Sequence, residues 1–140
     1  MNWKLILQLS LFGLAMGIAT VFVISSNAEW FFWLAIFLVS AYMIAIRAPG
    51  RYFLHGLCVG IANSVWVTAS HVALVNAYFA HHPKEVAMMA SMPLATHPRV
   101  MMLITGPVIG VLSGVVLGVF AIVASKLVKP APSRPTQTTV

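Results

Sequence analysis

One apolar stretch of this 140-residue chain, residues 52–79, holds most of the side chains that could bind a ligand. A helix there would gather its small and polar residues in an arc of roughly 160°, at about 100° per residue: Gly56, Gly60, Asn63, Ser64, Thr68, Ser70 and His71. Such groups are costly in lipid, so this face must meet protein or water. It either hydrogen-bonds neighbouring helices or lines a path or pocket, in which Asn63, Thr68 and His71 would contact a solute.

A second candidate group follows the stretch and combines imidazoles with thioethers, the ligands that suit Cu(I). It comprises His81, His82, Met88, Met92 and His97. Pro83 and Pro93 frame a predicted short helix over 83–92 on the outer surface, in which Met88 and Met92 share a face. The alternative is plain: methionine fills irregular apolar gaps, and the histidines are interfacial polar groups.

The sequence lacks the combinations of residues that are typical of catalytic sites. We therefore predict that the protein is not an enzyme and has no cofactor. The chain contains no aspartate, and its two acids, Glu29 and Glu85, are expected in different outer loops. The single cysteine, Cys58, excludes an intrachain disulfide and a cysteine-based redox motif. A haem with two axial histidines would need two deep imidazoles, and only His71 is expected to be deep.

Composition indicates a membrane protein, with 61% hydrophobic and only 7% charged residues, against about 25% charged in soluble domains. Four apolar runs can cross ~30 Å of hydrocarbon: about 5–24, 30–46, 52–79 and 100–125. The predicted fold is all-α, an integral membrane bundle of four transmembrane helices with a short outer-face helix between the third and fourth. It forms one domain, 1–129, followed by a disordered cytoplasmic tail, 130–140.

The positions of the basic residues set the expected orientation in the bilayer. Two bases, Lys84 and Arg99, fall on one side, and six fall on the other: Lys4, Arg47, Arg51, Lys126, Lys129 and Arg134. Both termini are therefore expected in the cytoplasm, with a bacterial inner membrane as the default location. Bases at span ends form no stripe for nucleic acid. A signal-peptidase site at residues 26–28 is the alternative, and would leave three spans.

Glycines four residues apart predict close helix contacts of the GxxxG or glycine-zipper type, because they leave a groove for another backbone. They are Gly13, Gly17, Gly56, Gly60, Gly106, Gly110, Gly114 and Gly118. The row in the last span would pack within the chain or form the seam of a homo-oligomer. Pro107 predicts a kink there, which is either a static bend or a hinge.

These features favour a small multi-pass membrane protein that transports a small solute or serves as a membrane-embedded subunit of a larger assembly. Its expected partners are the lipid bilayer and other copies or subunits, not nucleic acid. The two alternatives are an outer-face copper-binding protein and a protein whose polar groups only join helices.

Overall fold

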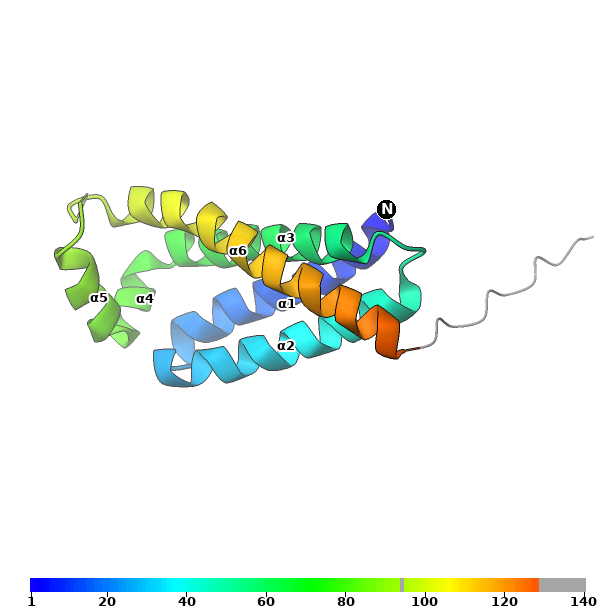
Figure 1. Ribbon diagram of the computed structural model, residues 1–140. Helices are drawn as coiled ribbons and strands as arrows, with labels where there is room; N and C mark the ends of the chain where they lie inside the picture. The colour runs from blue at the N-terminus through cyan, green and yellow to red at the C-terminus, as the bar shows by residue number, and fades with distance from the viewer. Residues whose placement is uncertain (94, 129–140) are drawn as a thin grey trace, which may run out of the picture.

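The computed structural model describes residues 1–93 and 95–128, and these form helices and connections without a strand. Four helices are long and apolar enough to cross a membrane: α1 (Trp3–Phe22), α2 (Ser26–Arg47), α3 (Tyr52–Ala73) and α6 (Pro98–Leu127). Two short helices, α4 (Val75–His81) and α5 (Pro83–Ala90), lie at the end of the molecule opposite the N-terminus (Figure 1). The predicted tail, 130–140, lies outside the described residues.

Helix α3 packs along α6 with almost no space between the two backbones. A Cβ added to Gly56 would lie 2.6 Å from the Cα of Gly118, and one added to Gly114 would lie 2.6 Å from the carbonyl oxygen of Leu57. Gly60 faces the backbone of Gly114 in the same way. The glycine row of the last helix therefore meets α3 of its own chain.

Helix α1 packs on another side of α3 through its own two glycines. A Cβ on Gly13 would lie 2.5 Å from the Cα of Asn63, and one on Gly17 would lie 3.0 Å from the Cα of Val67. Because the backbones of α1 and α3 are so close, a hydrogen bond can form between the two helices. The Gly13 N–H donates to Asn63 Oδ1 at 3.0 Å. Helix α3 is thus held on two sides by glycine contacts.

Helix α2 is packed over only half its length. Its buried residues, Ser40, Ala41, Ile44 and Ala45, all lie in the C-terminal half. Ala41 and Ile44 join a core that includes Leu117 and Ala121 of α6. The N-terminal half of α2 has no buried residue, so it stands away from its neighbours and leaves room for a cavity.

Helix boundaries differ from the sequence-based expectation in three places. Helix α2 begins at Ser26, so Glu29 lies in its first turn and not in a loop. The third helix ends at Ala73, because Leu74 leaves the helical conformation (φ −108°, ψ 27°) and α4 then packs against α1. The outer helix ends at Ala90, two residues before the predicted end. Neither proline nor glycine marks the break at Leu74.

His55 ties the start of α1 to the start of α3. The side chain is 1% exposed, its Nε2 accepts the Asn2 N–H at 2.9 Å, and its Nδ1–H donates to the Arg51 carbonyl at 3.0 Å. Arg51 closes the preceding turn with a left-handed φ of 53°.

We expect His55→Ala to lower the free energy of unfolding by about 2–4 kcal/mol, because it leaves a cavity and an unpaired backbone N–H. Thermal unfolding in detergent measures the loss. His97→Ala is the control, since the His97 side chain is exposed and its one hydrogen bond among the described residues is with its neighbour Thr96. Equal losses in the two variants would contradict the structural role of His55.

Candidate functional site

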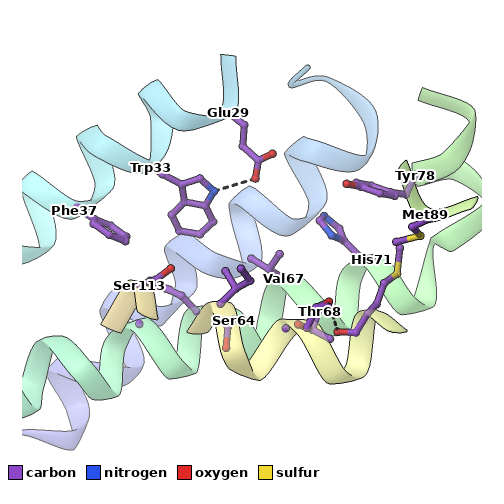
Figure 2. Close-up of a pocket in the computed structure, with 16 residues that line it drawn as sticks. Glu29, Trp33, Phe37, Ser64, Val67, Thr68, His71, Tyr78, Met89 and Ser113 are labelled. Carbon is purple, nitrogen blue, oxygen red and sulfur yellow. Dashed lines mark hydrogen bonds between the residues drawn. The ribbon is translucent and has the colours of Figure 1, made fainter. Parts of the chain in front are cut away.

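A cavity of about 240 Å³ lies between α2, α3 and α6, on the side of the unpacked half of α2. Residues of α4 and α5 close its outer end, through Tyr78 and Met89. Figure 2 shows the lining side chains, with α2 across the cavity from α3 and α6. The site thus lies within helices apolar enough to span a membrane and has mixed polar and aromatic walls.

The α2 wall is a stripe of three residues spaced four apart: Glu29, Trp33 and Phe37. Four-residue spacing puts them on one helical face, and all three are half-buried. Trp33 Nε1–H donates to Glu29 Oε1 at 3.0 Å, as the dashed line in Figure 2 marks. The hydrogen bond fixes the carboxylate beside the indole at the outer end of the cavity.

The α3 wall holds four of the five residues of the predicted polar face: Asn63, Ser64, Thr68 and His71. The fifth, Ser70, lies next to Gly17 of α1, and its hydroxyl donates to the Trp66 carbonyl of its own helix at 2.9 Å. Part of the arc therefore contacts α1, and part of it lines the cavity. A role of this face in binding a solute stays a prediction.

Asn63 is the deepest polar group of the lining, with 3% of its surface exposed. Its Oδ1 accepts the Gly13 N–H, while its Nδ2 has no hydrogen-bond partner among the described residues. A buried amide that lacks a partner is costly, and Nδ2 has almost no accessible surface, so it does not face the open part of the cavity.

His71 is oriented by α1. Thr20 Oγ1 lies 2.9 Å from His71 Nε2 and donates its single proton to the Met16 carbonyl at 2.8 Å. The hydroxyl therefore accepts from Nε2–H, which leaves Nδ1 of His71 as an acceptor. The ring of His71 stacks on Tyr78 with centroids 4.4 Å apart, and Tyr78 stacks on His82 at 4.3 Å. Three rings thus run from the cavity toward α5.

Tyr78 lies beyond the end of α3, at the outer mouth of the cavity. Burial, together with the charges of Glu85 and Glu29, raises the pKa of Tyr78 to about 12. Its phenol therefore stays protonated at neutral pH and can donate a hydrogen bond.

The residues of the copper hypothesis lie in separate places. His81 and His82 border a depression next to residues 25–27, and His97 borders another with Asn76 and Arg99. Met88 and Met92 are exposed. Among residues 1–93 and 95–128, no group of three or more His, Cys, Asp or Glu side chains is placed to hold a metal ion.

Helix α6 runs without interruption through Pro107, which borders a second, apolar pocket with Leu103 and Val111. Ser64 and Thr68 line both pockets. Gly106 and Gly60 also line the first cavity, but a Cβ on either would meet the neighbouring helix. A hinge at Pro107 stays a prediction.

The α2 stripe and Tyr78 were not among the site residues predicted from the sequence, and Glu29 was expected in a loop. One signal could have found the stripe: Glu29, the single acid in the apolar run, has aromatic residues four and eight positions later. That spacing puts a charge and two rings on one face.

Comparison of the chain with protein-family models, with curated proteins and with solved structures finds no match. The class of protein is therefore described from the structure of this chain alone. It is an all-helical protein with four helices suited to a membrane and a cavity of mixed polarity among three of them.

Proposed function

We propose that this protein crosses the membrane as a four-helix bundle and transports a small solute, which binds in the cavity between α2, α3 and α6. The observation that carries the proposal is a cavity of about 240 Å³ whose α3 wall holds Asn63, Ser64, Thr68 and His71. Ligand cavities are typically apolar with a few placed polar groups, and this lining fits that description.

Location along the helices also supports transport. Asn63 and Thr68 belong to the interior of α3, well inside its ends at Tyr52 and Ala73, so the polar wall is at membrane depth. Polar groups at that depth commonly mark solute pathways. The unpacked half of α2 provides a wall that has few contacts to lose when a solute enters.

Ser113→Phe is expected to fill the cavity and abolish solute binding, because Ser113 lies on its α6 wall. The measurement is the thermal stabilisation of purified protein by a panel of small cationic, neutral and anionic aromatic compounds. At least one charge class should raise the Tm of the wild type and leave the Tm of Ser113→Phe unchanged. Uptake of the stabilising compound into proteoliposomes then tests transport.

Val115→Phe is the matched control, since Val115 is exposed on α6 and is not among the lining residues. It should respond to the panel as the wild type does. The proposal is wrong if no charge class stabilises the wild type, or if Ser113→Phe binds as strongly as Val115→Phe.

A further inference from the structure

Building on the proposed function, we propose that the solute is an organic monocation, an amine or quaternary ammonium attached to an apolar body. Glu29 supplies the opposite charge, the ring of Trp33 forms the wall against which the cationic group rests, and the Tyr78 hydroxyl lies at the same end of the cavity (Figure 2). All three residues line the cavity.

Charge is the first argument. Of the residues described at the cavity lining, one is a carboxylate and none is a lysine or arginine. An anionic solute would meet Glu29 without a basic group to offset it, whereas a cation would replace the water lost by the carboxylate with a direct ion pair. Glu85 is the other acid of the chain, and its charge also reaches Tyr78 at the cavity mouth.

The state of Glu29 is the second argument. Its Oε1 is held by the Trp33 indole N–H at 3.0 Å, so the carboxylate is fixed in place. Among the described residues this is the one hydrogen bond of the carboxylate, so Oε2 can accept from a ligand. The first turn of α2 favours a negative charge at this position.

Aromatic side chains are the third argument. The face of tryptophan attracts cations through its ring quadrupole, and quaternary ammonium groups are recognised in this way. Tyr78 is stacked with His71 and His82, so Trp33 is the ring that takes this role.

Figure 2 shows the hydroxyl end of Tyr78 directed toward Glu29, with the Trp33 indole below the carboxylate. Cation, carboxylate and indole can thus meet at one end, while Phe37 and Met102 offer apolar surface to the rest of the molecule.

Polar groups line the rest of the cavity, with Ser64, Thr68 and His71 on α3 and Thr105 and Ser113 on α6. The cavity therefore matches a cation with a modest polar substituent better than a plain hydrocarbon.

The test compares three probes of similar shape: benzyltrimethylammonium, its neutral carbon isostere neopentylbenzene, and phenylmethanesulfonate. Quenching of tryptophan fluorescence and the shift in Tm report binding to the purified wild type, Glu29→Gln and Glu85→Gln. Glu29→Gln preserves the acceptor for Trp33 and removes only the charge. We expect Glu29→Gln to lower the affinity for benzyltrimethylammonium at least tenfold and to change the affinity for neopentylbenzene by less than twofold. Glu85→Gln should change the affinity for benzyltrimethylammonium by less than threefold.

The outcomes separate the two proposals. If only the neutral or anionic probe binds, or if Glu29→Gln binds the cation as the wild type does, the cation assignment is overturned while the cavity remains a solute site. If none of the probes binds, both proposals are overturned. If Glu29→Gln weakens all probes equally and lowers the Tm without ligand, Glu29 has a structural role at the start of α2, and the assignment is overturned as well.

Discussion

Gly60→Leu is expected to abolish the folded protein. A Cβ at Gly60 meets the backbone of α6, including the Gly114 nitrogen at 2.5 Å and the Ser113 carbonyl carbon at 3.2 Å. Backbone atoms cannot rotate away, so α3 and α6 must separate over several turns. Overpacking of this kind costs about 1–3 kcal/mol in soluble cores, and loss of the contacts between two whole helices adds to it. Size-exclusion chromatography in detergent should show aggregate in place of the monodisperse peak.

Two further variants test whether the expected effect is specific to the contact between α3 and α6. Val116→Leu adds a similar group to an exposed position of α6 and should leave the protein intact. Gly110→Ala should be milder than Gly60→Leu and should be rescued by Ser64→Gly, because the atoms it meets first belong to the Ser64 side chain. A Gly60→Leu protein that stays folded but dissociates from an oligomer would contradict packing within the chain and would place the glycine row between subunits.

Labelling with a membrane-impermeant maleimide should separate the two ends of the molecule completely. In a Cys58→Ser background, Lys84→Cys should react in intact cells, and Lys126→Cys should react only after permeabilisation. The start of α1 and the last turns of α6 lie at one end of the molecule, and α5 lies at the other (Figure 1). The excess of bases at the first end favours the cytoplasm for it.

The opposite labelling pattern would reverse the orientation, and labelling of both cysteines in intact cells would contradict four crossings. An N-terminal tag on the same proteins tests the signal-peptide alternative, because cleavage after residue 28 would remove the tag together with α1. We expect the tag to stay, since α1 contacts α3 through Gly13 and Gly17, and half of its most apolar window is buried.

Hydropathy is a good guide to which segments form long helices, since burial in lipid requires length and few charges. Three of the four long helices end within a few residues of the expected positions. The break at Leu74 escaped prediction because it arises from packing of α4 on α1 and is not marked by a helix-breaking residue. Local sequence does not encode a contact between segments 50 residues apart.

For a related reason, the sequence predicted the site residues of α3 but not those of α2. Polar residues of α3 stand out against an apolar background, so Asn63, Thr68 and His71 were found. Trp33 and Phe37 are apolar residues in an apolar helix, and no periodicity separates the side that faces a cavity from the side that faces lipid. Which side of α2 faces the cavity depends on the helix packed beside it. Only the C-terminal half of α2 is packed, because that is where α6 contacts it.

Helix α2 is held at both ends and is open between them. The connection 23–25 ties its start to α1, and its C-terminal half packs against α6. The glycine contacts that join α1, α3 and α6 do not involve the first half of α2. Substitutions along that half are therefore expected to change the cavity wall with little effect on stability, which is set by the other three long helices.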